Sequence, residues 1–253
     1  MTTDVRTIEA TAPHRPATRT PMTRSRKLAL AAGVAYLLTF VFSIPTLGMK
    51  APLDNADFIL GAGSTTGVTW GALFDFLCGV AGIASAVALY PVTRLQSRSS
   101  ALGFVVSRTL EAAILTVGAI SLLAMVTLRQ DFAGASGDVA TSLGVTGQSL
   151  LALHDWSFLF GPGMMPAINA LLLGSILYRS RLVPRALPTM GLIGAPLLLV
   201  ASFGTLFGAW DQVSSPSVLV VPLALWELSL GFYLTFKGFR PSPLLDEDAI
   251  APA

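Results

Sequence analysis

The chain has 253 residues, of which 53% are hydrophobic and 12% are charged, and its formal net charge is +2. Soluble domains average roughly 45 to 50% apolar and about 25% charged residues, so this composition predicts a membrane protein. The single cysteine, Cys78, excludes an internal disulfide, and two histidines far apart in sequence exclude HExxH zinc and paired-histidine haem sites. We therefore expect neither a metal nor a cofactor.

Six apolar stretches follow one another along the chain, each long enough to cross a hydrocarbon core that needs about 20 helical residues. They are Leu28 to Gly48, Gly67 to Val92, Ala101 to Leu128, Leu150 to Tyr178, Thr189 to Ala209, and Ser217 to Phe236. None alternates with the period of two that a barrel strand requires. The pattern predicts an all-α polytopic membrane protein, a bundle of six transmembrane helices spanning residues 24–240.

The two ends of the chain lack apolar periodicity, which predicts disordered tails. Residues 1–23 are basic, and residues 241–253 carry an acidic Asp-Glu-Asp cluster. The basic tail fixes membrane topology or, as an alternative, contacts anionic lipid headgroups. Nothing in either tail indicates nucleic-acid binding.

The distribution of positive charge predicts the orientation, because cytoplasmic loops retain lysine and arginine. Thirteen of the 16 lysine and arginine residues lie before the first span, after the sixth span, or in the connections after the second and fourth spans. The opposite loops hold only Lys50 and Arg129, together with several aspartates. We expect both termini in the cytoplasm. The outer segment Arg129 to Gln148, rich in Gly, Ala, Ser and Thr, is expected to be a flexible connection or lid, and Leu53 to Gly63 a short interfacial turn.

Ionisable residues inside the spans are the main candidates for a functional site. They are Asp75, Arg108, Glu111, His154, Asp155 and Glu227. A charge at the membrane centre costs at least about 2.5 to 3.5 kcal/mol, so these side chains should face the bundle interior and pair, protonate or line a cavity. If they share one cavity, the acids exceed Arg108 by three charges. The alternative is that they lie apart as structural interhelical hydrogen bonds.

Three of the acids occur early in spans that run from outside to inside. The segments "ALFDFLCG" and "ALWELSLG" place Asp75 and Glu227 in the same local frame, and "LHDWSFLFG" places Asp155 similarly. This pattern predicts three helical hairpins, each presenting a carboxylate to a shared interior, as in transporters built from parallel repeats. A chance match in a chain rich in Ala, Leu and Gly is the alternative.

The fourth span contains "FGPGMMPAINA", where Pro162 and Pro166 each remove an amide hydrogen. We expect the helix to break near mid-membrane. Such a break either exposes backbone groups to a ligand or simply kinks the helix for packing. Asn169 lies on nearly the same helix face as Asp155 and is a candidate for supporting the polar site.

Catalytic motifs are absent from the sequence: it has no GxSxG, HExxH, Walker A or GxGD segment. His154 and Asp155 are adjacent and point about 100° apart, so they cannot form the His-Asp half of a triad with each other. An enzyme remains open through Asp75 and Glu227 as an acid/base pair, provided both reach one substrate atom.

The stretch "SRTLEAAI" holds Arg108 and Glu111 three residues apart, on one helix face where they can pair. If the third helix enters lipid at Ala101, the two residues form an ion pair in the membrane core. If it enters at Thr109, Arg108 instead snorkels to the cytoplasmic surface. Helix depth decides between these two predictions.

Several segments together resemble the bacterial integral-membrane family catalogued as domain of unknown function 4386, over roughly Arg24 to Pro241. They are "RKLALAAGVAYLLTFVFSIP", "FILGAG", "ALYPV", "SRTLEAAI", "LHDWSFLFGPG", "LLLGSILYRSRLVPR" and "LWELSLGFYLTFKGFRP". The resemblance implies a multi-pass protein of the bacterial cytoplasmic membrane. The polar segments that recur in this family match Arg108, Glu111, His154, Asp155 and Glu227, the residues already chosen because charge inside a membrane is costly.

These observations favour transport of a small molecule or proton through a carboxylate-rich cavity in the lipid bilayer. Six helices are few for a transporter, which favours a homo-oligomer. The alternatives are a sensing or scaffolding protein with a structural polar network, and an intramembrane enzyme. A midplane cavity open to water favours transport or chemistry, whereas a closed interior with every acid paired favours the structural alternative.

Overall fold

The computed structural model describes residues 22–210 and 217–245, and every regular element within them is helical. The α-helices are α1 (Arg24–Met49), α2 (Thr65–Gln96), α3 (Arg98–Asp131), α4 (Gly137–Phe158), α5 (Met165–Ser180), α6 (Ala186–Leu206) and α7 (Ser217–Phe236). Short 3-10 turns occupy Ala51–Asp54, Phe58–Leu60 and Pro243–Leu245. Nearly all of the basic N-terminal tail, the acidic cluster of the C-terminal tail, and Asp211 lie outside the described residues.

The seven helices make six candidate membrane spans, because α4 and α5 are joined end to end by a π-helical turn, Leu159–Met164. Each span is long and apolar enough to cross a bilayer. The prediction of an all-α protein with six such spans is confirmed.

The six spans form a closed ring. Around it, α1 packs on α2, α2 on α3, α3 on the α4–α5 span, α5 on α6, α6 on α7, and α7 returns to α1. We call the end where α1 begins and α7 finishes the inner end, following the predicted orientation. In the described residues α4 packs along α3 but makes few contacts with α1, α6 or α7. The ring is therefore complete in its inner half and looser in its outer half.

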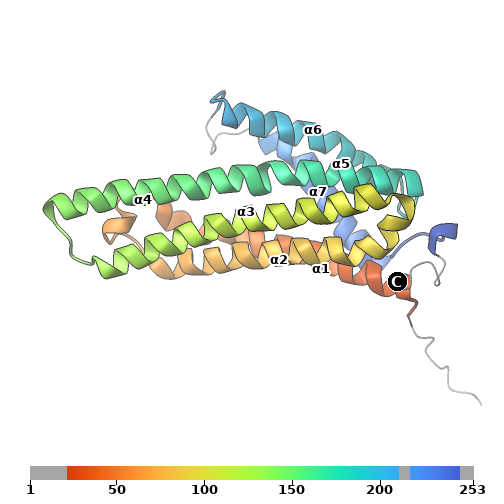
Figure 1. Cartoon of the computed structure of the whole chain (residues 1–253), viewed down its shortest axis with the longest axis horizontal. Coiled ribbons are helices and arrows are strands. Elements are labelled where there is room, and N and C mark those ends of the chain that lie inside the picture. Colours follow the sequence, from red (N-terminus) through yellow and green to blue (C-terminus); the bar gives the residue numbers. More distant parts are fainter. Residues whose placement is uncertain (1–21, 211–216, 246–253) are drawn as a thin grey trace, which may run out of the picture.

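The helices differ in length, and the shortest ones, α6 and α7, indicate which part of the bundle lies in the membrane. With a rise of about 1.5 Å per residue, the 21 residues of α6 and 20 residues of α7 extend about 30 Å, the thickness of a hydrocarbon core. By the same rise α2 and α3, with 32 and 34 residues, are about 50 Å long. Their outer ends and that of α4 extend past the outer end of α6 (Figure 1), so they form a projection outside the membrane.

The prediction that Arg129 to Gln148 forms a flexible connection or lid is wrong. Helix α3 continues to Asp131 and α4 begins at Gly137, which leaves a connection of only five residues. Packing stabilises the added turns, since a Cβ at Gly147 would lie 2.9 Å from the side chain of the buried Ile59. Small residues that suggested a loop in the sequence instead let α4 approach the segment after α1 closely.

Arg129 ties this outer segment to α3. Its guanidinium donates hydrogen bonds of 2.6 to 2.8 Å to four carbonyl oxygens, those of Phe58, Gly61, Ala62 and Gly63. It also lies over the Phe58 ring, 4.7 Å from the centroid. The expected short turn at Leu53 to Gly63 is therefore a compact cap, built from two 3-10 turns, on the outer ends of α2 and α3.

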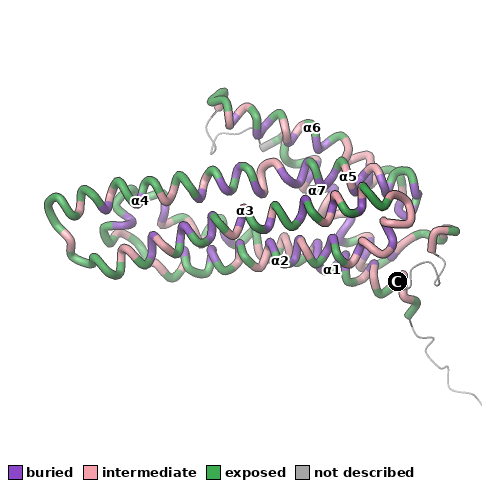
Figure 2. Tube along the Cα trace, viewed as in Figure 1, coloured by how far each residue is buried: buried purple, intermediate pink, exposed green. Residues whose placement is uncertain are grey.

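The inner half is closely packed. A Cβ at Gly33 of α1 would lie 2.5 Å from the Thr235 nitrogen of α7, and a Cβ at Gly191 of α6 would lie 2.5 Å from the Trp226 ring. Small residues thus let α1 and α7 meet backbone to backbone, and let the Trp226 ring of α7 lie directly on the α6 backbone. Figure 2 shows buried residues on the faces that the helices turn toward one another and mostly exposed residues at the outer end of α4.

The orientation predicts which surface positions are reached from outside the cell. In a Cys78→Ala background, cysteine at Ser136, exposed before α4, should react with an impermeant maleimide on intact cells. Cysteine at Ser99, exposed at the start of α3, should react only after the cells are permeabilised. The opposite labelling pattern would mean that the protein is inserted the other way round.

Candidate functional site

A three-helix polar network lies in the middle of the membrane. Arg108 of α3 bridges two carboxylates: its Nη1 is 3.0 Å from Glu111 Oε2, one turn along the same helix, and its Nη2 pairs with Glu227 Oε1 of α7. Asn169 of α5 donates from Nδ2 to the same Glu111 oxygen at 2.6 Å. One guanidinium thereby joins α3 to α7, and Glu111 joins α3 to α5.

The position of Glu227 decides the depth of this network. Glu227 lies ten residues after Ser217 and nine before Phe236, so it is about 15 Å from either end of α7. Arg108 is 4% exposed and pairs with it directly. Of the two predictions for Arg108, the core ion pair is therefore correct, and the snorkelling alternative is wrong.

Aromatic and small residues surround the guanidinium of Arg108. Arg108 lies over the rings of Tyr36 and Phe104, 5.3 and 5.8 Å from their centroids. Opposite it, a Cβ at Gly82 of α2 would lie 3.8 Å from Arg108 Cδ. The aromatic faces attract the cation, and the small residue leaves room for its stem.

A second ion pair lies closer to the outer end. Lys50, the residue that follows α1, extends its ammonium to Asp75 Oδ2 at 2.5 Å, and both side chains are largely buried. The ammonium also lies 5.6 Å from the centroid of the Phe158 ring. Its stem crosses α2 at Gly71, where a Cβ would approach Lys50 Cγ to 3.1 Å.

The two ion pairs occupy different levels of the bundle. Gly82 faces Arg108, and Asp75 lies seven residues earlier on α2, which is about 10 Å further out along the helix axis. Asp75 and Glu227 are thus too far apart to contact one substrate atom together. This separation does not support the acid/base pair considered for an intramembrane enzyme.

Both levels line one cavity of about 760 Å³. Its walls come from α1, α2, α3, α4, α5 and α7, and the lining includes exposed residues such as Ile44 of α1, Phe158 of α4 and Val220 of α7. Toward the inner end it stops at Arg108 and Glu227, beyond which a core of fully buried side chains, including Phe104, Trp226 and Leu230, fills the bundle. The cavity is therefore open in the outer half of the bundle, where α4 makes few contacts with α1 or α7, and closed toward the inner end.

The cavity is rich in acid. Its lining holds five carboxylates against two cations; the seven residues are Asp54, Asp75, Glu111, Asp155, Glu227, Lys50 and Arg108. The geometry pairs Asp75 with Lys50, and Glu111 and Glu227 with Arg108. With all groups ionised, the cavity has an excess of three negative charges, which favours cations and protons within it.

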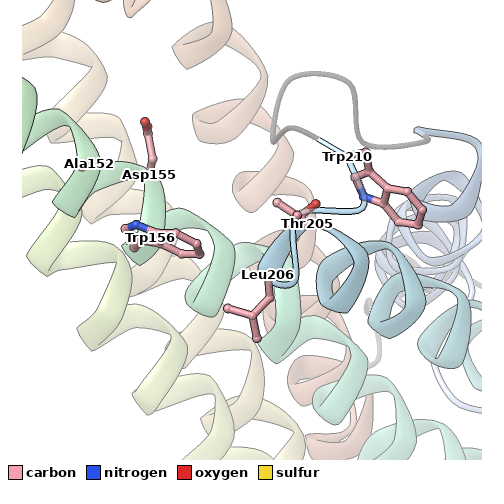
Figure 3. Close-up of a pocket in the computed structure, with 7 residues that line it drawn as sticks. Ala152, Asp155, Trp156, Thr205, Leu206 and Trp210 are labelled. Carbon is pink, nitrogen blue, oxygen red and sulfur yellow. The ribbon is translucent and has the colours of Figure 1, made fainter.

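Asp155 lies between this cavity and a second pocket. The second pocket, of about 360 Å³, opens between α4 and the outer end of α6, and Figure 3 shows Trp156 pointing from α4 toward Leu206 and Thr205. Asp155 lines both spaces. The adjacent His154 packs instead against Gly118 of α3, where a Cβ would lie 3.2 Å from its Nδ1. Both neighbours line the cavity, but of the two only Asp155 also lines the second pocket.

The π-helical turn brings Pro162 and Pro166 to the cavity wall. A proline cannot donate a backbone hydrogen bond, so the turn leaves carbonyl groups in need of donors. Ser202 of α6 binds this turn at a neighbouring carbonyl, donating from Oγ to the Gly163 oxygen at 2.7 Å. The predicted helix break is present, and it takes the form of a widened turn rather than a gap.

The structure brings the predicted polar residues together. Asp75, Arg108, Glu111, His154, Asp155 and Glu227 all line the cavity, and Asn169 supports Glu111 from behind. Sequence reasoning missed Lys50, Tyr36 and the cavity position of Cys78. The excess of acidic residues within the spans pointed to a second cation. Because Arg108 is the only lysine or arginine well inside the predicted spans, this cation had to come from a span end, as Lys50 does. Within the described parts of the chain, no group of three or more His, Cys, Asp or Glu residues is arranged to hold a metal ion.

A buried polar cavity inside six apolar spans defines a multi-pass membrane protein. The family described as Domain of unknown function (DUF4386) matches residues 31–238, and the chain belongs to it. Neither a curated protein nor a solved structure matches the chain.

The bridging role of Arg108 predicts its contribution to stability. Arg108→Gln leaves two buried carboxylates without their cation and should lower the free energy of unfolding by about 3 kcal/mol. Adding Glu227→Gln should recover part of the loss, because it removes one uncompensated charge. Unfolding in mixed micelles measures both. Arg98→Gln, at an exposed position, is the control, and an equal effect of the two arginine substitutions contradicts the bridging role.

Proposed function

We propose that this protein transports a small molecule across the cytoplasmic membrane of a bacterium, with the acidic cavity as its outward-facing binding site. One observation carries the proposal: a cavity open in the outer half of the bundle ends at the ion pairs of Arg108, and the inner half beyond them is filled with buried side chains. A transporter in an outward-open state has this division, with one side accessible and the other closed.

Proton coupling follows from the charges at the bottom of the cavity. Arg108 compensates only one of the two carboxylates that it contacts, Glu111 and Glu227. A proton bound by this pair balances the network, and its release restores a negative charge. Since Glu227 belongs to α7 and Arg108 to α3, protonation weakens the bond between these helices. The binding of a proton is thereby linked to helix movement, as coupled transport requires.

The competing proposal is a static sensing or scaffolding protein. The pairing of Asp75, Glu111 and Glu227 with cations favours it, since a structural network would show the same pairs. A structural network does not need an open cavity of this size beside it, which is why we favour transport. We also infer a homo-oligomer, because six helices are few for a transporter.

Cys78 allows the proposal to be tested without knowing the substrate, because it lines the cavity on α2. Alternating access predicts that an impermeant methanethiosulfonate modifies Cys78 from the outside in spheroplasts and from the inside in inverted vesicles. Glu227→Gln should raise the inside reaction about tenfold, because the neutral side chain mimics the protonated network and weakens the bond between α3 and α7.

Cys78→Ser provides the blank for this labelling. Modification from the outside alone, in the wild-type protein and under both imposed directions of the proton gradient, would overturn transport and favour a static pocket. An inside reaction that is unchanged or lower in Glu227→Gln would instead contradict the role assigned to Glu227.

A further inference from the structure

We propose that the cavity binds an organic cation with an ammonium group and an apolar body, and that the Lys50 ammonium marks its charged subsite. This inference rests on the proposed function in that it names the class of substrate for the same cavity. Four observations carry it: the surroundings of Lys50, the way its stem is held, the charge of the cavity and the character of its walls.

The Lys50 ammonium lies in a site suited to amines. It contacts the Asp75 carboxylate at 2.5 Å and lies 5.6 Å from the centre of the Phe158 ring. A carboxylate together with an aromatic face is the combination that recognises alkylammonium groups. The chain's own lysine therefore shows which chemistry this subsite accepts.

Lys50 can leave this site more easily than Arg108 can leave its own. Its backbone lies just beyond the last residue of α1, and its flexible four-carbon stem crosses α2 at Gly71. Arg108, by contrast, is in the middle of α3 and is bound to two carboxylates. Lys50 is thus a tethered competitor that a soluble amine can replace, while Arg108 is a fixed part of the bottom of the cavity.

The charge of the cavity supports the same class of ligand. Five carboxylates against two cations make entry of a cation favourable and entry of an anion unfavourable.

The remaining walls fit an apolar body. Phe40, Leu47, Leu115 and Val220 contribute aliphatic and aromatic surface to the cavity wall. A volume of about 760 Å³ lies in the range of ligand sites, roughly 300 to 1,000 Å³. A molecule with its ammonium at Asp75 and its apolar part directed inward would reach toward Arg108, about 10 Å away.

Three probes that share a phenyl group on a short alkyl chain but differ in charge test the inference: 4-phenylbutylamine, 4-phenylbutan-1-ol and 4-phenylbutyrate. The full-length protein in nanodiscs is treated with a maleimide, and each probe's protection of Cys78 is measured. The amine should protect at a concentration about tenfold lower than the alcohol, and the acid should not protect. Equal protection by amine and alcohol would falsify the ammonium subsite.

Variants separate the subsite from general binding. Lys50→Gln removes the tethered competitor and should lower the protecting amine concentration about tenfold, whereas Asp75→Asn should raise it by a similar factor. Phe158→Leu keeps the fold's apolar surface and should weaken protection about threefold, which preserves the test if Asp75→Asn does not fold. Lys237→Gln and Asp57→Asn, outside the cavity, are the matched controls. Weaker amine protection in Lys50→Gln overturns the competitor role.

The two proposals fail in different ways. If the amine does not protect Cys78 but Cys78 reacts from both membrane sides, the substrate class is wrong and transport stands. If the amine protects but labelling stays one-sided, the cation site stands and transport is wrong.

Discussion

The guanidinium of Arg108 lies at mid-membrane between carboxylates from two helices, and the arrangement around it follows from the cost of that charge. An isolated cation there would cost several kcal/mol, so α3 must bring Glu111 and α7 must bring Glu227 to the same place. Tyr36 and Phe104 supply aromatic faces, and Gly82 supplies room. Fixing one charge thus fixes the relative depth of three helices.

The bundle is divided into two halves with opposite properties at this level. On the inner side, glycines such as Gly33 and Gly191 allow helices to touch directly, and large side chains fill what remains. On the outer side, α4 follows α3 and leaves space beside α1 and α7. A chain that needed only to be stable would have little reason to stop packing at its ion pair. The change from a filled to an open interior is what makes the polar network accessible to a ligand.

The fold was largely predictable from sequence because its signals are local. Six apolar runs specify six spans, and the cost of intramembrane charge selects residues that do line one cavity, such as Asp75 and Glu227. The depth of Arg108 was not predictable, since one helix can slide in the membrane and only its partner on α7 fixes it. Lys50 was missed for a related reason: its backbone is in a loop, and only the three-dimensional path over Gly71 brings its charge inside. The helical start of α4 depends on contact with Ile59, which no local pattern encodes.

The bonds from Arg129 to the segment after α1 have a mechanical consequence. They join that segment to α3, and Gly147 packs α4 against the same segment, so the outer ends of α1 to α4 behave as one rigid post. The hairpin of α6 and α7 is outside this post and meets it at mid-membrane through Glu227. A rearrangement that opens the inner half and keeps these outer ends together therefore has to move α5 or this hairpin, and moving the hairpin breaks the bond between Arg108 and Glu227.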